Sequence, residues 1–328
     1  MNLVREVDSL MVKKREIVNL PCGGIASFCK FPICTNLEKI NSNIAVIGIP
    51  WDSGTGYRPG SRLGPRTIRE YSVRYSFRER GVKQGGYWDL DENKRFLEKI
   101  TFCDCGDVDV LYLDVNETFE RITEDITTIL SNGVFPVVLG GDHSITFPVV
   151  RAYEGINSEL NLIHFDAHLD YTDSVLGVKL ASGSPIKRCS ELGFIKEIVT
   201  FGVRGLRTIE GAYRDSLKRN NKIISANQIL FGEKEDIFSK IPSGKAYVTI
   251  DIDVLDPSIA PGTCSPEFGG INYLHLKLLL KEVANKCDVI GMDMVEVNPS
   301  FDDNSGSTAL IATQTILEFL GVIFDKKE

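Results

Sequence analysis

The 328-residue sequence has little that marks a secreted, membrane or nucleic-acid-binding protein. None of its eight cysteines forms a CxxC pair, which argues against a structural zinc or thioredoxin-like site. The first residues, MNLVREVDSLMVKKRE, have no apolar core of a signal peptide, and no apolar run approaches the length of a membrane span. We therefore expect a cytoplasmic protein with reduced thiols and no membrane contact.

An excess of positive charge is also absent. The formal net charge is −8, which argues against a general nucleic-acid surface. This charge suits a small cationic substrate, although an acidic surface that keeps the protein soluble explains it more simply. With 43% hydrophobic and 25% charged residues, the composition is that of an ordinary globular chain.

Short apolar runs alternate with amphipathic stretches from residue 43 onward. This alternation favours a parallel sheet covered by helices on both faces. We predict one doubly wound α/β domain over 43–328, with about seven or eight strands, after an irregular N-terminal arm over 1–42. Residues 77–98 are polar and unpatterned, so we expect a loop there. The predicted strands are 43–50, 100–105, 135–140, 161–166, 197–203, 246–251 and 288–297. Residues 61–76 are predicted to be a loop that enters a helix, and the other predicted helices lie near 114–131, 144–154, 207–219, 272–286 and 306–322.

Polar motifs stand at the ends of the predicted strands, where parallel sheets bind ligands. In FDAHLD (165–170), Asp166, His168 and Asp170 are two residues apart, so in an extended segment they share one face. Two carboxylates and an imidazole on one face need a cation between them. A metal ion explains this pattern better than a solvated acidic loop, because the strand just before it is apolar.

Two further strand ends carry residues of the same chemistry. GGDHS (140–144) places His143 after a glycine turn, and TIDIDVLDP (249–257) places Asp251 and Asp253 on one face. Each motif alone is weak. Together they offer more ligands than one ion needs, and oxygen-rich, thiol-free ligation favours two Mn²⁺ ions that share and deprotonate a water molecule. The six predicted ligands are His143, Asp166, His168, Asp170, Asp251 and Asp253.

The motifs GGDHS, FDAHLD and DIDVLDPSIAPGT, in this order, resemble the signatures of the ureohydrolase (arginase and agmatinase) family. GYRPGSRLGPRTIRE and the final VEVNP add to the likeness, which extends over about residues 43–320 and looks most like agmatinase. The resemblance implies a three-layer α/β fold, a two-manganese site and a homo-oligomer, a trimer or hexamer. It also implies hydrolysis of a small guanidino compound to urea and an amine by a metal-bridging hydroxide.

The resemblance also assigns roles to single residues. The six ligands above match the family's metal ligands, and Asp170 would in addition pass a proton toward the leaving amine. Glu296, in VEVNP, matches the carboxylate that pairs with the substrate guanidinium. That pairing is chemically sensible, because a planar cation with several donors suits a carboxylate.

The sequence departs from the family pattern at three places. DAHLD is followed by Tyr171 rather than the asparagine of arginases, which makes arginine an unexpected substrate. ASGSP (181–185) places Ser182 where the family has a proton-shuttling, substrate-contacting histidine, and serine cannot be charged near neutral pH. Cys264 stands where a glycine is usual, either beside the site or as a small buried thiol.

Three interpretations remain open from the sequence. The first is an active hydrolase of agmatine or a related substrate, such as a guanidino acid, formiminoglutamate or guanidine itself. The second is a metal-binding paralogue with little catalysis, which the missing histidine favours and the complete ligand set opposes. The third, a deacetylase-like zinc enzyme, uses fewer ligands. The sequence does not decide the substrate or the metal, and Ni²⁺ or another divalent ion also suits these ligands.

Overall fold

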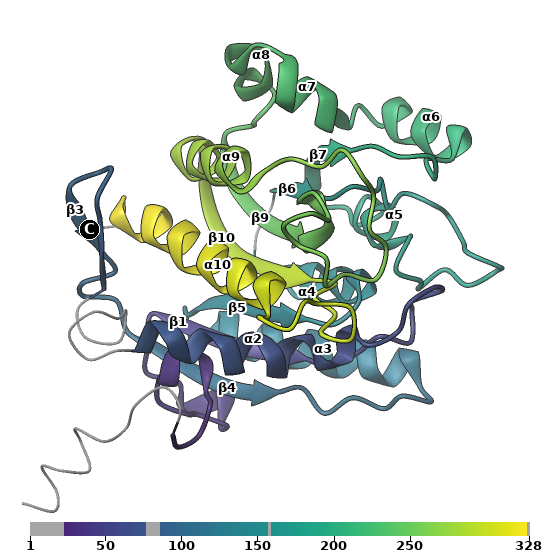
Figure 1. Ribbon diagram of the computed structural model, residues 1–328. Helices are drawn as coiled ribbons and strands as arrows, with labels where there is room; N and C mark the ends of the chain where they lie inside the picture. The colour runs from purple at the N-terminus through teal and green to yellow at the C-terminus, as the bar shows by residue number, and fades with distance from the viewer. Residues whose placement is uncertain (1–22, 77–85, 157–158, 327–328) are drawn as a thin grey trace, which may run out of the picture.

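In the computed structural model, which describes residues 23–76, 86–156 and 159–326, a single eight-stranded sheet runs through the molecule (Figure 1). Its strands lie in the order β4-β1-β5-β10-β9-β6-β7-β8, and each neighbouring pair is parallel. This confirms the predicted doubly wound parallel sheet. The strands are β1 (Ile44–Ile49), β4 (Phe102–Asp107), β5 (Phe135–Gly140), β6 (Leu160–Phe165), β7 (Ile195–Val203), β8 (Lys222–Ser225), β9 (Gly244–Asp251) and β10 (Cys287–Val295).

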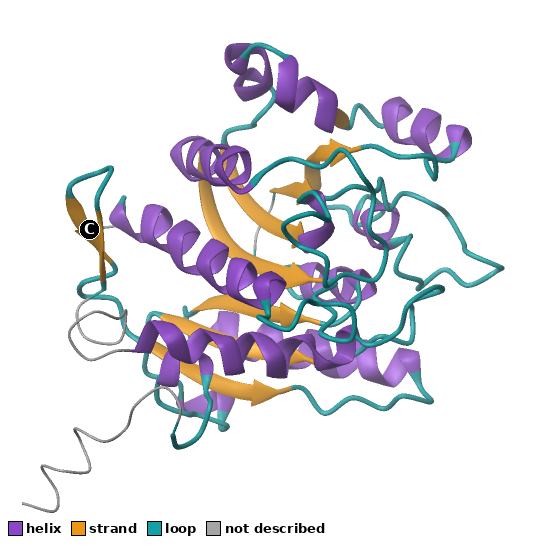
Figure 2. Cartoon of the chain, viewed as in Figure 1, coloured by secondary structure: helices purple, strands orange, loops and turns teal. Residues whose placement is uncertain are grey.

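Helices cover both faces of the sheet, which makes three layers (Figure 2). One face carries α2 (Gly64–Ser72), α7 (Ala226–Phe231), α8 (Lys234–Ser239), α9 (Tyr273–Lys286) and α10 (Ser307–Asp325). The other carries α3 (Val115–Ser131), α4 (Thr146–Arg151) and α5 (Pro185–Cys189). A further helix, α6 (Glu210–Lys218), follows β7 and buries only Ser216.

Strand β1 explains why the predicted strands are continuous apolar runs. All six of its residues are buried. Ile44 and Val46 join the core on the α10 side, whereas Ala45, Ile47 and Ile49 join the core on the α3 side. A strand with helices on both faces needs apolar side chains at every position, because neither face meets water.

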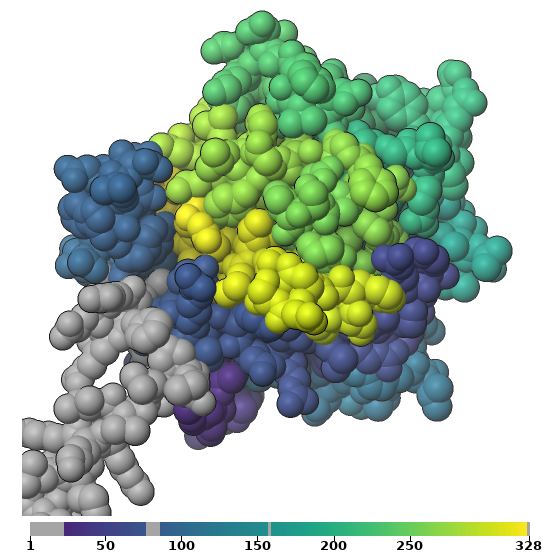
Figure 3. Space-filling view, in the orientation of Figure 1, coloured from purple at the N-terminus to yellow at the C-terminus, as the bar shows by residue number. Residues whose placement is uncertain are grey.

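Helix α10 corrects the expectation that no apolar run approaches the length of a membrane span. By length and composition alone its 19 residues could cross a membrane, but 67% of the apolar window is buried inside the protein. Figure 3 shows the C-terminal part of the chain, in yellow, between the yellow-green region of α9 and the blue region of α2. A helix enclosed in this way is apolar because the core surrounds it.

Several short elements were not predicted. They are β8, α5, α7, α8 and a two-stranded hairpin of β2 (Tyr87–Asp89) and β3 (Lys94–Phe96). The hairpin shows that the predicted loop over 77–98 was wrong where the structure describes it, since residues 77–85 lie outside the described residues. Each of these elements has at most six residues. Periodicity is a weak signal over so few positions.

The described part of the predicted arm, residues 23–42, packs against the sheet edge. Phe31 stacks on Phe102 of β4 with ring centroids 4.3 Å apart, and the Phe28 N–H donates to Asp104 at 2.7 Å. Residues 1–22 lie outside the described residues, and the boundary at residue 42 stays a prediction. The seven described cysteines are free, and the Cys103 and Cys105 sulfurs lie 3.7 Å apart, well beyond a disulfide bond.

Candidate metal centre and substrate cavity

Four adjacent strands at the middle of the sheet, β5, β10, β9 and β6, deliver the predicted site residues. His143 follows β5, Asp166 follows β6, Asp251 ends β9 and Glu296 follows β10. Parallel neighbours end at the same edge of a sheet, so residues up to 153 positions apart in sequence meet there. The structure thus brings all six predicted ligands and Glu296 together.

The six predicted ligands form two groups that share Asp166. In the first, His143 Nδ1 lies 3.0 Å from Asp166 Oδ2, 3.2 Å from Asp170 Oδ2 and 3.3 Å from Asp251 Oδ2. In the second, His168 Nδ1 lies 3.2 Å from Asp166 Oδ1 and 3.1 Å from Asp253 Oδ2. Since each oxygen of Asp166 faces a different group, its carboxylate is placed to bridge two ions.

The donor atoms of these groups fit divalent cations. His143 Nδ1 is buried and makes no hydrogen bond of acceptable geometry, although three carboxylate oxygens lie within 3.3 Å of it. Ligand atoms that converge on one point without bonding to each other are what a cation site requires. The donors are carboxylate oxygens and imidazole nitrogens with no thiolate, a set that suits manganese and similar ions.

Burial and crowding show in the pKa values of the carboxyl groups. Burial and the charges of Asp253 and Asp166 raise the pKa of Asp251 well above its usual range. Burial opposes ionisation of Asp166 too, but the adjacent imidazoles of His143, His164 and His168 hold its pKa well below the usual range. Several carboxylates are thus held close together in a buried place, where a divalent cation would favour their ionised forms.

His164 is a site residue that the sequence analysis missed. It is fully buried, with Nε2 2.9 Å from Asp166 Oδ2 and Nδ1 3.2 Å from Thr200 Oγ1. It also joins His143, Asp166 and Asp170 in one group of possible ligand atoms. The spacing of two residues that linked Asp166, His168 and Asp170 extends back to His164, so the same rule could have found it.

Two acidic residues of the site adopt the left-handed backbone conformation. Asp170 has φ 47° and Glu296 has φ 63°. Hydrogen bonds hold both: the Asp170 carbonyl accepts from Ile186 N at 3.2 Å, and Glu296 N donates to Gly141 O at 2.8 Å. Strained backbone of this kind is common where a side chain must be aimed at a functional site.

The glycines of GGDHS serve close packing rather than an unusual backbone angle. Neither Gly140 nor Gly141 has a positive φ. A Cβ atom at Gly141 would lie 1.8 Å from the Trp51 carbonyl oxygen. The following Asp142 is not a predicted ligand, and its Oδ2 accepts a hydrogen bond from Gly54 N at 2.7 Å. This motif therefore fixes the loop after β1 beside the site.

Glu296 is 6% exposed, and its two carboxylate oxygens differ in their hydrogen bonding. Its Oε1 accepts from the His143 N–H at 2.8 Å, whereas no N–H or O–H group of the described residues donates to its buried Oε2. Burial and the charge of Asp142 raise the pKa of Glu296 to about 8. A cation with N–H donors would both satisfy Oε2 and favour the ionised carboxylate.

A cavity of about 640 Å³ opens beside the ligand groups. Asp170, Asp251, Asp253 and Glu296 form what we call its floor. Ser182 lines it as well, and its N–H donates to Gly54 O at 3.1 Å, which joins the two wall loops. The sequence left Cys264 either beside the site or as a small buried thiol. Both descriptions apply, because Cys264 is 1% exposed and also lines the cavity. Burial and the Glu296 charge raise its pKa.

The sequence and the fold of this chain are similar to those of known proteins. The arginase family model matches residues 42–321. The chain is similar to human mitochondrial guanidino acid hydrolase, at 34% identity over 90% of this chain and 82% of that protein. It is similar to agmatinase of Bacillus subtilis, at 35% identity over 88% and 94%. Among solved structures, proclavaminate amidino hydrolase of Streptomyces clavuligerus matches with a TM-score of 0.81 and 28% identity over 92% and 98%.

Proposed function

Because this chain belongs to the arginase family, we propose that it hydrolyses a small guanidino compound to urea and an amine at a centre of two divalent ions. It is a hydrolase that acts on amidine C–N bonds, as its relatives' names state for them. The finer points, namely the substrate, the metal and the role of each residue, are proposals supported by the geometry of the site.

His143, Asp166, Asp170 and Asp251 would hold one ion, and Asp166, His168 and Asp253 the other. Asp166 would help to hold both ions, since its two oxygens lie in different ligand groups. We propose Mn²⁺ as the metal because the donors are mostly hard oxygens, while Ni²⁺ or another divalent ion is the alternative. Two such ions lower the pKa of water enough for it to attack the guanidinium carbon at neutral pH.

The side chains of the floor would then orient the substrate and move one proton. Oε2 of Glu296 is the observation that carries this proposal, since this buried acceptor at the cavity wall has no N–H or O–H donor among the described residues. It would accept a guanidinium N–H and turn the carbon toward the ligand groups. Asp170, with its side chain 11% exposed, reaches both His143 and the cavity. It would take the proton from water and deliver it to the nitrogen whose bond to carbon breaks.

A panel of guanidino compounds tests this function directly. Protein loaded with Mn²⁺ should release urea from at least one of agmatine, guanidino acids of two to four carbons, or guanidine. Asp253→Ala should lose at least one metal ion, and it should also lose urea release. Stoichiometric metal binding without urea from any compound would instead support the catalytically weak paralogue, which the serine at position 182 favours.

Two properties of the whole protein remain proposals. We propose that it works in the cytoplasm and as a homo-oligomer, a trimer or hexamer, with neither nucleic acid nor a membrane as partner. Sedimentation of the purified chain tests the oligomer. A monomer at micromolar concentration would contradict it.

A further inference from the structure

The cavity changes in character from its floor to its mouth. Every acidic side chain that lines it belongs to the floor. The remaining described lining residues are small, hydroxyl-bearing or apolar, apart from His168 and one arginine, Arg207. Arg207 is exposed and lies in the segment that joins β7 to α6, with its neighbours Thr208 and Ile209 also in the wall. The mouth of the cavity, as we use the term, is this segment with the exposed Tyr57 and Leu176.

The charge of Arg207 is available to a ligand. No carboxylate in the described part of the chain forms an ion pair with it. Glu210, three residues further on, pairs with Arg214 at 2.7 Å, and Glu267, whose carboxylate lies beside Gly205, faces His168 at 3.7 Å. The other arginine of this segment, Arg204, donates to backbone carbonyls that include Asp253 O at 2.7 Å. Arg207 is therefore placed to receive an anion from the cavity.

The charges of the loaded site favour an anionic substrate tail. The ligands Asp166, Asp170, Asp251 and Asp253 carry four negative charges, which two divalent ions would balance. The fifth carboxylate, Glu296, would be balanced by the guanidinium. No acidic residue among the described lining residues then remains for a second cationic group such as the amine of agmatine, whereas Arg207 has no ion-pair partner within the described residues.

We infer that Arg207 binds the carboxylate tail of the substrate, so the natural substrate is an ω-guanidino acid. This inference rests on the proposed function, in which Glu296 holds the other end of the molecule. An arginine offers two parallel N–H donors that match a carboxylate. The hydroxyl groups of Thr172, Ser174, Ser182 and Ser265 line the same cavity and add donors. A cavity of about 640 Å³ also leaves room for more than guanidine itself.

The test compares substrates of similar length and different charge at the tail. 4-Guanidinobutyrate ends in a carboxylate, agmatine in an ammonium and N-butylguanidine in a methyl group. Shorter guanidino acids identify the chain length that fits best. For the manganese-loaded wild-type enzyme, kcat/KM should be highest for a guanidino acid. Arg207→Ala should raise the KM for this guanidino acid about fivefold to fiftyfold. That range corresponds to a stabilisation between those of a solvated and a desolvated ion pair.

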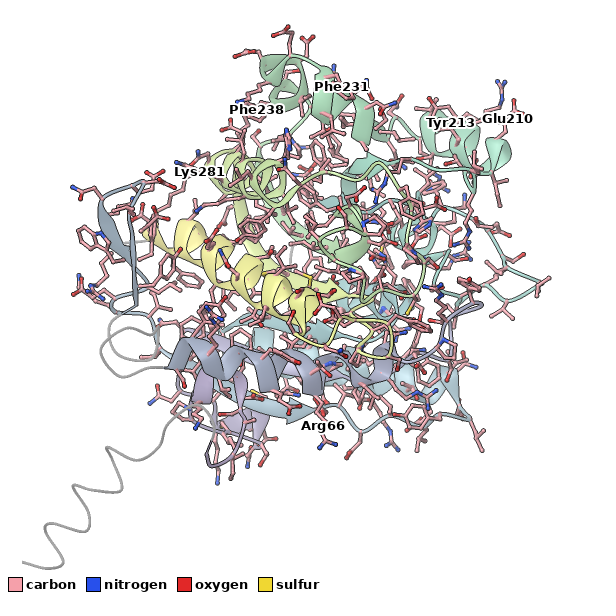
Figure 4. The ribbon with its side chains drawn as sticks, viewed as in Figure 1. Arg66, Glu210, Tyr213, Phe231, Phe238 and Lys281 are labelled. Atoms are coloured by element: carbon pink, nitrogen blue, oxygen red, sulfur yellow. The ribbon has the colours of Figure 1, made fainter. Side chains whose placement is uncertain are left out.

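Two further readouts separate tail binding from a general defect. Because tail binding acts equally on ground and transition states, kcat for the guanidino acid should stay within about twofold. Kinetics with N-butylguanidine should not change. Arg207→Glu should reverse the preference toward agmatine, and Arg207→Lys should restore part of the KM. The matched controls are Arg66→Ala and Arg66→Glu, because Arg66 is an exposed arginine of α2 outside the cavity lining. Figure 4 shows it on the opposite side of the molecule from Glu210 and Tyr213 of α6.

The outcomes distinguish this inference from the proposed function. If agmatine is the best substrate and Arg207→Glu does not change the preference, the function stands and the tail site is wrong. If no compound yields urea, the proposed function fails. Calorimetric titration of the manganese-loaded protein with 4-guanidinobutyrate then decides the tail site. Binding that Arg207→Glu abolishes supports it, while equal binding by both proteins, or none, overturns it.

Discussion

Glu296 combines three features at the scale of one residue: burial, a left-handed backbone and an oxygen to which no N–H or O–H group in the described part of the chain donates. We predict that Glu296→Gln lowers kcat/KM about tenfold to a hundredfold, because a charge-assisted hydrogen bond is worth about 1.5–3 kcal/mol. Both metal ions should stay bound, since Glu296 is outside the ligand groups. Glu318→Gln is the matched control, because Glu318 pairs with Lys277 away from the cavity. Unchanged kcat/KM in Glu296→Gln would make the residue structural.

Ser182 lines the cavity where the family resemblance calls for a histidine. We predict that Ser182→His impairs hydrolysis of the best guanidino acid by crowding and brings no large gain on agmatine. The reason is that the retained ligands and the arginine at the mouth suit a different substrate. Urea release by both proteins on both compounds measures this.

A second histidine substitution supplies the control for Ser182→His. Ser174 lines the same cavity, so Ser174→His adds an imidazole there at a different place. General acid–base help is typically worth about 10²–10⁴-fold. A gain of that size on agmatine in Ser182→His alone would show a weakened agmatinase and contradict the prediction that the cavity suits a different substrate.

Residue spacing predicted much of the site, but not all of it. The six ligands stand at the ends of buried strands or just after them, so their convergence could be inferred before any coordinates. They are His143, Asp166, His168, Asp170, Asp251 and Asp253. Arg207 could not be found in this way, because an arginine in a polar loop carries no periodic signal. Its relation to the cavity arises only when the segment after β7 folds beside Asp170 and Ser182.

At the scale of elements, sequence prediction succeeded where a segment had a long, consistent pattern and a cap. Helix α3 begins after Asp114, which caps Glu117 N at 3.0 Å, and α9 begins after Asn272, which caps His275 N at 3.0 Å. Both helices match their predicted ranges to within one residue. Strand β8 has four residues, of which only Ile224 is buried, so its position depends on pairing with β7 rather than on its own pattern.

The contact of α2 with the edge strand β4 gives a prediction about elements. Arg69 of α2 is 8% exposed, with Nε 2.8 Å from Asp104 Oδ2 and Nη1 2.6 Å from Asp107 Oδ1. Removing Arg69 would take the charge partner from the buried Asp104, which would keep, among the described residues, only backbone N–H donors such as that of Phe28. We expect Arg69→Ala to lower the free energy of unfolding by about 3–5 kcal/mol. Arg66→Ala, on the same helix but exposed, should change it by about 0.5 kcal/mol or less.

Urea or guanidinium unfolding of the three proteins measures this difference. The slope of the transition should be similar in all of them, so that the midpoint reports stability. Equal midpoints for the two alanine variants would mean that the ion pairs between α2 and β4 add nothing beyond an exposed residue.

At the scale of the whole molecule, the fold concentrates negative charge in its own interior. The carboxyl ends of four central strands bring five carboxylates together, four of which line the cavity, and burial and the neighbouring carboxylates raise the pKa of Asp251. Divalent ions that bind only the folded chain relieve this repulsion. Metal loading should therefore affect global stability as well as catalysis.

The last prediction is that the purified chain binds two divalent ions and is stabilised by them. At a free metal concentration of about 100 Kd, each site adds about 2.7 kcal/mol, which together raises the melting temperature on the order of 10 °C. Mass spectrometric metal analysis after Mn²⁺ incubation should find two ions per chain, and a chelator should reverse the thermal shift. Asp253→Ala should lose at least one ion and about half of the shift, whereas Asp91→Ala, at an exposed turn, should keep both. One ion or none in the wild-type chain would contradict the two-metal centre, because Asp166 would then have no second ion to bridge.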